Sequence, residues 1–199
     1  MTPAVHLLVF EGFADWEPAY ALAEVRRSGG FEVVTMGFTP VPVRSMGGIR
    51  VVPDQVLAAV EPARVRLLLL PGGDLWEGED YPREPLEALL HRLEREEVPI
   101  AAICGATLAA ARAGLLEDRA HTSNELAYLQ RIPSYGGSSR YVDALAVRDR
   151  GLITASGLGP TEFAREIFEE LGVFSPEDRR LWYQVFKYGR FPEPSGQPG

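Results

Sequence analysis

The stretch PIAAICGATLAAARAG, residues 99–114, places the chain's only cysteine between a short apolar run and an alanine-rich segment. A continuous apolar run is typical of a strand buried on both faces, and the segment after it ends at a glycine, as helices often do. The stretch therefore predicts a strand, a tight turn at Cys104 and a helix. Cys104 is then either a small buried hydrophobe or a nucleophile presented on the turn.

The same alternation of strand and helix extends over most of the 199 residues. Strands are expected at 5–10, 31–38 and 65–70, hairpins at 43–53 and 143–156, and helices at 17–30, 84–96 and 160–172. Alternating strands and helices predict an α/β fold with a mostly parallel sheet covered on both faces. With no linker or internal repeat in view, we expect one domain over 1–199, with a C-terminal helix at 175–188 and a loose tail at 190–199.

Composition narrows the partners and the compartment. The formal net charge is −8, which argues against nucleic acid and anionic membranes as partners. No apolar run approaches the ~20 residues that a membrane-spanning helix needs. The N-terminal MTPAVHLLVF has no basic leader, and a lone cysteine forms no internal disulfide, so we expect a cytoplasmic protein.

Ligands of an open parallel sheet bind outside the carboxyl ends of its strands. That rule selects the loops EGFADWEP (11–18), PGGD (71–74), CGA (104–106) and ASGLGP (155–160). None of them holds a G-x-G-x-x-G after the first strand or a P-loop, so no nucleotide cofactor is expected. We also predict no metal. The only lysine, Lys187, lies in the C-terminal helix, away from these loops, which disfavours Schiff-base chemistry.

Cys104 is the candidate nucleophile. A thiol at a strand-to-helix turn lies near the positive end of the helix dipole and near free N–H groups, so we expect its pKa to be lowered. The N–H of Gly105 would point into the site and could hold an oxyanion, with Gly73 as a second backbone donor.

Glu17 and His121 are the candidate partners of the thiol. Glu17 precedes Pro18, which favours the first turn of a helix, so Glu17 is either an N-cap carboxylate or a neighbour of Cys104. A neutral Glu17 could donate a hydrogen bond to sulfur, and the two groups would then titrate jointly. His121, in RAHTSNE, is either the base of a Cys–His pair or a surface histidine in a connector.

These segments resemble the ThiJ/PfpI superfamily, the class I glutamine amidotransferase-like family. The resemblance rests on GFADWEPAYALAEVRRSG (12–29), LLLLPGGD (67–74), AAICGATLAAARAGLL (101–116) and GLITASGLGPTEFAREI (151–167). It implies a flavodoxin-like three-layer α/β/α sandwich and a homodimer. It also implies that Cys104 is the reactive thiol, that Glu17 is its hydrogen-bonded partner, and that Gly73 and Gly105 form the oxyanion pocket.

The sequence departs from the family pattern at its histidines. Protease-like members have histidine directly after the cysteine, where this chain has Gly105, and many members have histidine where this chain has Asn124. The late His-x-Glu of true glutaminases is missing from ITASGLGPTEF (153–163). An ordinary glutaminase or peptidase triad is therefore disfavoured, and His121, Asn124 or water remain alternatives for completing the site.

Two classes of function follow from these residues. The first is a cysteine-dependent hydrolase or amidotransferase-like enzyme, in which the Cys104 thiolate attacks a small carbonyl or amide substrate. The second is a redox-sensing or stress-protective protein whose Cys104 is oxidised to sulfinic acid. A glyoxalase- or deglycase-like activity on reactive dicarbonyl compounds is a further alternative.

Overall fold

The computed structural model describes residues 4–191 of the chain. These residues form nine strands and six α-helices. In chain order they are β1 Ala4–Val9, α1 Ala19–Arg27, β2 Val33–Gly37, β3 Val43–Arg44, β4 Arg50–Val51, β5 Gln55–Val56, β6 Val65–Leu70, α2 Arg83–Arg95, β7 Ile100–Ile103, α3 Ala106–Arg112, α4 Leu126–Leu129, β8 Ala146–Asp149, β9 Leu152–Ala155, α5 Pro160–Leu171 and α6 Pro176–Tyr188.

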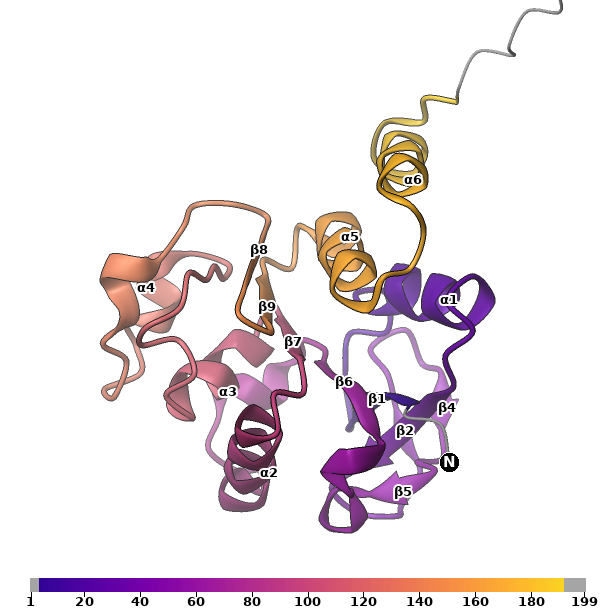
Figure 1. The fold of residues 1–199 in the computed structure, drawn as a ribbon. Coiled ribbons are helices and arrows are strands. Elements are labelled where there is room, and N and C mark those ends of the chain that lie inside the picture. The colour runs from indigo at the N-terminus through magenta and orange to yellow at the C-terminus, as the bar shows by residue number, and fades with distance from the viewer. Residues whose placement is uncertain (1–3, 192–199) are drawn as a thin grey trace, which may run out of the picture.

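Seven strands form one sheet in the order β5-β2-β1-β6-β7-β9-β8 (Figure 1). Every neighbouring pair is parallel except β8 and β9, which form the predicted antiparallel hairpin. β1, β7 and β9 are buried along their whole length, as their continuous apolar sequences predict. The prediction of an α/β fold with a mostly parallel sheet is confirmed.

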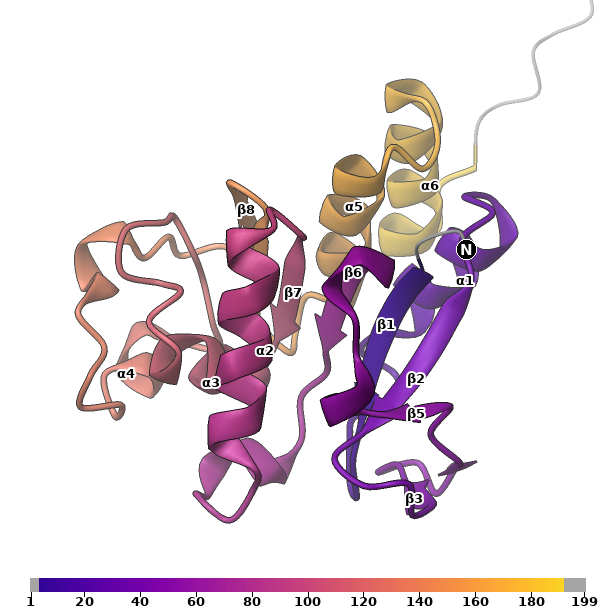
Figure 2. The same cartoon turned by 60° about the horizontal axis from the view of Figure 1, so that its bottom comes forward.

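Helices cover both faces of the sheet. α2 and α3 lie on one face, and α1 and α5 lie on the other (Figures 1 and 2). α2 presents an apolar stripe to the sheet, made of Leu86, Leu89, Leu90 and Leu93. No helix in the described part of the chain is long and apolar enough to cross a membrane.

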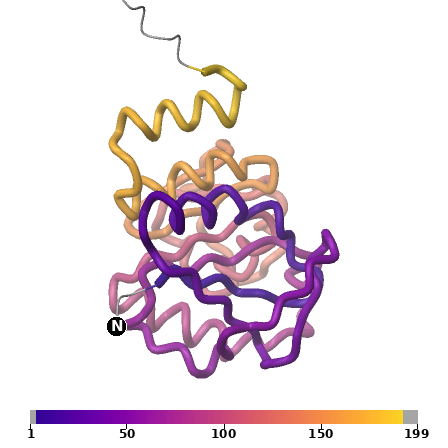
Figure 3. The backbone as a smooth tube through the Cα atoms, turned by 90° about the vertical axis from the view of Figure 1, so that its right-hand side faces the viewer, coloured from indigo at the N-terminus to yellow at the C-terminus, as the bar shows by residue number. Residues whose placement is uncertain are grey.

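The C-terminal helix α6 forms a further layer outside α1 and α5 (Figure 3). Ser175 caps its N-terminus by accepting a hydrogen bond from the N–H of Asp178. Trp182 anchors the helix: its ring packs edge-on against Phe168, and its Nε1 donates to the buried Glu24 carboxylate at 3.2 Å. Most of the tail predicted at 190–199 lies outside the described residues.

Two elements of the structure are not predicted by the sequence. β5 has two residues and forms the edge of the sheet beside β2, and α4 is a single turn of four residues. Neither is long enough to show a hydrophobic period. The predicted hairpin around Gly47 and Gly48 is present as β3 and β4.

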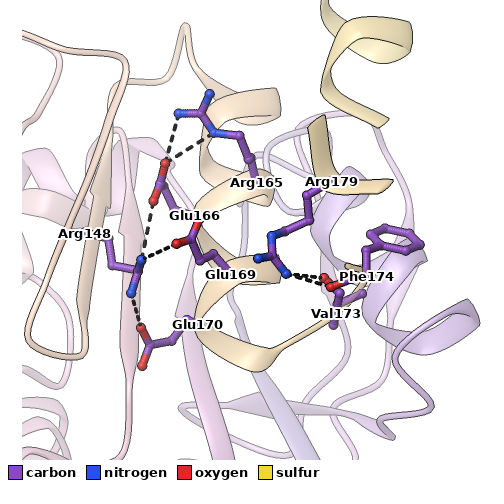
Figure 4. Close-up of polar contacts among 8 residues, drawn as sticks. All are labelled: Arg148, Arg165, Glu166, Glu169, Glu170, Val173, Phe174 and Arg179. Atoms are coloured by element: carbon purple, nitrogen blue, oxygen red, sulfur yellow. Dashed lines mark hydrogen bonds and ion pairs between the residues drawn. The ribbon is translucent and has the colours of Figure 1, made fainter. Parts of the chain in front are cut away.

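One arginine joins α5 to the edge of the sheet. Arg148 on β8 reaches Glu166, Glu169 and Glu170 of α5, at 3.5, 3.0 and 3.2 Å (Figure 4). After α5, Arg179 donates to the carbonyls of Val173 and Phe174, which holds the turn into α6 (Figure 4).

Replacing Arg148 by alanine should destabilise the protein by about 1–2 kcal/mol in dilute buffer, because three neighbouring carboxylates lose their shared cation. The loss should shrink in about 1 M NaCl, which screens their repulsion. Urea unfolding at both salt concentrations measures it. Arg26→Ala, which removes one surface ion pair, with Glu32 at 3.8 Å, is the control and should have little effect. Equal stability of the two variants would contradict this account of the β8–α5 contact.

Candidate functional site

Cys104 lies on a sharp turn between β7 and α3. Its φ is 58°, in the left-handed region that non-glycine residues rarely adopt. The turn is fixed by main-chain contacts: the Cys104 N–H donates to Ala155 O at 2.9 Å, and Cys104 O accepts from the N–H and the hydroxyl of Thr107. Such strain is retained where the surrounding structure demands it. The turn leaves the thiol half-buried at the carboxyl edge of the sheet.

The Glu17 carboxyl group lies beside the Cys104 side chain: a Cβ added to Gly157 would lie 2.9 Å from Cys104 Sγ and 3.3 Å from Glu17 Oε1. Glu17 lies in the loop between β1 and α1, one residue before the N-cap Pro18, and is 1% exposed. Its Oε2 accepts a hydrogen bond from the N–H of Gly72 at 2.6 Å. A Cβ added to Gly72 would lie 2.6 Å from that oxygen, so the glycine is what allows this close approach. The structure therefore brings Glu17 and Cys104 together.

Asn124 is the second side chain at the sulfur. Its Nδ2 donates to Cys104 Sγ at 3.4 Å, and its Oδ1 accepts from the Gly157 N–H at 2.9 Å. The bond from Gly157 fixes which end of the amide faces the sulfur, so Asn124 is a donor there. Of the alternatives left open by the sequence, the structure places Asn124 at the thiol. An amide has no basic nitrogen, so it orients the sulfur without taking its proton.

His121 is not brought to the site. Its imidazole is buried, its Nδ1 donates to Arg119 O at 2.7 Å, and its Nε2 accepts from the Tyr135 hydroxyl at 2.7 Å. Burial lowers the pKa of the ring, which keeps it neutral. Both ring nitrogens are occupied and the ring does not line the cysteine cavity, so the structure does not support His121 as the base.

The cavity over the thiol holds ≈ 110 Å³. Its lining residues come from five connecting segments and from α4: Ala14, Trp16, Glu17, Met46, Gly73, Asp74, Glu77, Cys104, Gly105, Asn124 and Tyr128. Gly73 and Gly105, expected as oxyanion donors, both belong to this lining. Neither the Gly73 N–H nor the Gly105 N–H has a main-chain acceptor among residues 4–191.

The prediction of a lowered thiol pKa is wrong. Burial raises the pKa of Cys104, and the negative charge of Glu17 raises it further, whereas the donors of Asn124 and Gly105 lower it. α3 has only seven residues, so its dipole is a small contribution. Burial also raises the pKa of Glu17 to about 7, against the opposing hydrogen bonds from Gly72 and Cys104. As pH rises, the pair therefore loses its first proton near 7, mostly from Glu17, and the remaining proton is held mostly by the thiol.

Replacing Asn124 by alanine should raise the thiol pKa further, because a hydrogen bond to the charged sulfur is lost. Alkylation by iodoacetamide at neutral pH should slow about tenfold. Asn124→Asp is the informative partner: it exchanges the donor for a negative charge and should slow the reaction further. Wild-type rates in Asn124→Ala would contradict the role assigned to this amide.

Fold and site together define a flavodoxin-like α/β protein with a cysteine on the turn after a central strand and a buried glutamate beside it. The chain belongs to the DJ-1/PfpI family, whose model matches residues 3–170. The resemblance found in the sequence is thereby confirmed.

Individual relatives agree. An uncharacterized protease of Bacillus subtilis, YoaZ, is 39% identical over 94% of this chain and 91% of its own length. A DJ-1 superfamily protein of Agrobacterium tumefaciens is similar in structure, with a TM-score of 0.88 and 38% identity over 95% of this chain and 99% of that one. A thiJ/pfpI family protein of Bacillus anthracis has a TM-score of 0.85 and 34% identity over 96% and 92%.

Proposed function

We propose that the protein is a cysteine-dependent enzyme whose Cys104 sulfur adds to the carbonyl carbon of a small substrate. The observation that carries the proposal is the placement of the sulfur between the Glu17 carboxyl group and the Asn124 amide, in a cavity of ≈ 110 Å³. This arrangement offers one proton acceptor, one fixed donor and two candidate backbone donors for an oxyanion.

The first step is a proton transfer coupled to addition. The Glu17 carboxylate takes the thiol proton, a sulfur lone pair forms the S–C bond, and the C=O π electrons move to oxygen. The N–H groups of Gly73 and Gly105 stabilise that oxygen until Glu17 returns the proton, which gives a hemithioacetal. A glutamate with a pKa of about 7 suits both directions of this transfer.

A small α-dicarbonyl compound is the substrate that the site serves with the groups present. Glu17 transfers the proton of the hemithioacetal carbon to the neighbouring carbonyl carbon, while the proton of the hemithioacetal hydroxyl passes to the neighbouring carbonyl oxygen, which gives a 2-hydroxy thioester. Water then attacks the thioester carbon, the C–S bond breaks, and the 2-hydroxy acid and the Cys104 thiol are released. The aldehyde carbon is oxidised and the ketone carbon is reduced, so no outside oxidant is needed. Amide hydrolysis requires protonation of an amine leaving group as well as water activation, and among the described lining residues no histidine is available for it.

Incubation with methylglyoxal tests the proposal. We expect lactate as the product by NMR, and a transient adduct on Cys104 by mass spectrometry. Fluorogenic peptides and glutamine should not be turned over. Peptide cleavage without dicarbonyl conversion, or conversion with no adduct on Cys104, would contradict the proposal.

A redox role is the second candidate, supported by the half-buried thiol and the hydrogen bond that it accepts from Asn124. Peroxide would convert the thiolate to the sulfenic and then the sulfinic acid, whose oxygens would accept bonds from Asn124 and a protonated Glu17. Mass spectrometry after mild peroxide treatment tests it, with two added oxygens expected on Cys104. Oxidation confined to methionine would exclude the sensor.

A homodimer is part of the proposal. Two large apolar side chains at the carboxyl edge of the sheet are exposed, Leu158 at 81% and Leu145 at 36%, and their loops are joined by the hydrogen bond from the Ser156 N–H to Leu145 O. Clustered exposed apolar groups of this size are typical of contact surfaces. Light scattering should give twice the 21.9 kDa chain mass, and Leu158→Asp should shift the protein toward monomer. A monomeric wild type would contradict the dimer.

A further inference from the structure

We infer that the cysteine cavity selects substrates by charge: it admits small carbonyl compounds that are uncharged or cationic and excludes those that carry a carboxylate or phosphate. This inference rests on the proposed function, since it names the substrate class of the same site. Three acidic residues, Glu17, Asp74 and Glu77, line the cavity, and among residues 4–191 no arginine, lysine or histidine does.

Asp74 contributes an uncompensated charge. It follows Gly73 directly, at the start of the short 3-10 helix Asp74–Glu77, and its side chain is exposed at the cavity. No cationic side chain of the described residues lies within ion-pair distance of it. An anion approaching the sulfur therefore meets this carboxylate with nothing to offset it.

Glu77 is partly compensated from outside the cavity. Its Oε1 accepts a hydrogen bond from the Tyr128 hydroxyl at 2.6 Å, and its Oε2 pairs with Arg131 at 3.2 Å. Arg131 lies over the Tyr128 ring, 4.2 Å from its centroid, and lines a neighbouring cavity instead of this one. Glu77 thus lines the cysteine cavity, whereas Arg131, which pairs with it, does not. Asp74, which has no such partner among the described residues, therefore contributes more to the charge selectivity of the cavity.

The remaining lining suits uncharged and cationic groups. Trp16 and Met46 are 51% and 44% exposed, and both face the cavity. An exposed indole offers apolar contact to a neutral compound and a cation–π contact to an ammonium or guanidinium group. The carboxylates that line the cavity also repel the 2-hydroxy acid product, which is an anion. The uncharged substrate can therefore enter the cavity, and its anionic product is driven out.

Three methanethiosulfonate reagents test the inference directly on Cys104: the methyl, the trimethylammonioethyl and the sulfonatoethyl compound. Each rate is divided by the rate of the same reagent with 2-mercaptoethanol, which removes the difference in intrinsic reactivity between the reagents. At low salt we expect this normalised rate in wild-type protein to be at least about tenfold higher for the cationic reagent than for the anionic one. Asp74→Asn should reduce that ratio about three- to tenfold, and about 0.5 M salt should reduce it in both proteins.

Glu96→Gln is the matched control. Glu96 is exposed at the C-terminal end of α2, before β7, so it lies at the sheet edge opposite the site while its loss changes net charge equally. Its ratio should stay within about twofold of wild type. The neutral reagent should react at similar rates with all three proteins, which reports an intact site.

Equal normalised rates for the cationic and anionic reagents, or an unchanged ratio in Asp74→Asn, would overturn the inference. The outcome is separate from that of the proposed function because these reagents need no turnover. Charge selection without conversion of methylglyoxal would refute the reaction and leave the selectivity standing. Conversion of methylglyoxal without charge selection would refute the selectivity and support the reaction.

Discussion

Replacing Cys104 by alanine should lower turnover of a small dicarbonyl by on the order of 10³-fold or more, because no S–C bond can then form. Cys104→Ser should be nearly as inactive, since a hydroxyl loses its proton far less readily than a thiol and Glu17 is too weak a base to take it. Lactate production under initial-rate conditions measures both variants.

Thermal unfolding and circular dichroism of the same variants provide the control. Cys104 keeps its left-handed backbone through bonds from its N–H and its carbonyl oxygen, and neither involves the sulfur. Both variants should therefore fold as the wild type does. A folded Cys104→Ala protein with full turnover would end the assignment of the reaction to this residue.

Replacing Glu17 by glutamine should change how stability depends on pH. Glu17 is buried and its pKa is raised to about 7. The folded protein therefore retains a proton that the unfolded chain has lost between its unfolded pKa of 4.5 and about 7, so wild-type stability falls as pH rises through this window. The difference corresponds to about 3 kcal/mol at its limit. Glu17→Gln removes the titration, so its stability relative to wild type should increase from pH 4.5 to above 7.

Glu24 is the natural comparison, as a second buried carboxyl group with the opposite shift. Burial works against its ionisation, but hydrogen bonds from Arg27, Ser28 and Trp182 outweigh it and lower the pKa. Its contribution to stability is present above the unfolded pKa and is lost as pH falls through the lower folded pKa, so Glu24→Gln should lose most relative to wild type at neutral pH. Urea unfolding across pH separates the two variants. Parallel pH profiles for Glu17→Gln and wild type would contradict the raised pKa.

Much of the fold was predictable because long segments show one clear period. The strand at 65–70 coincides with β6, and Gly172 ends α5 in the left-handed conformation expected of a terminal glycine. The turn at Cys104 followed from an apolar run that meets a helix. The sequence could not show β5. Its two residues are too few for a pattern, and they form a strand only because the backbone of β2 offers them hydrogen-bond partners.

The site was predicted in part. The strand-end rule brought Glu17, Gly73, Cys104 and Gly105 to one place, and the structure has them around one cavity. His121 and Asn124 are three residues apart, yet only Asn124 faces the sulfur, because side-chain direction depends on how the loop folds. The predicted direction of the thiol pKa shift is wrong for a related reason. Burial of the sulfur and the nearby Glu17 charge, which raise this pKa, both result from tertiary packing and are not visible in the local sequence. The cytoplasmic location stays a prediction.

The central claim is that Glu17 and Cys104 share one proton, and the pH dependence of iodoacetamide alkylation at Cys104 tests it most directly. In wild-type protein we predict two rises in rate: one near pH 7, where the pair loses its first proton and a fraction exists as thiolate beside neutral Glu17, and one at higher pH, where the second proton leaves. Glu17→Gln should show a single rise, at a pH below the upper wild-type one. Superimposable single-step curves for the two proteins would contradict the account.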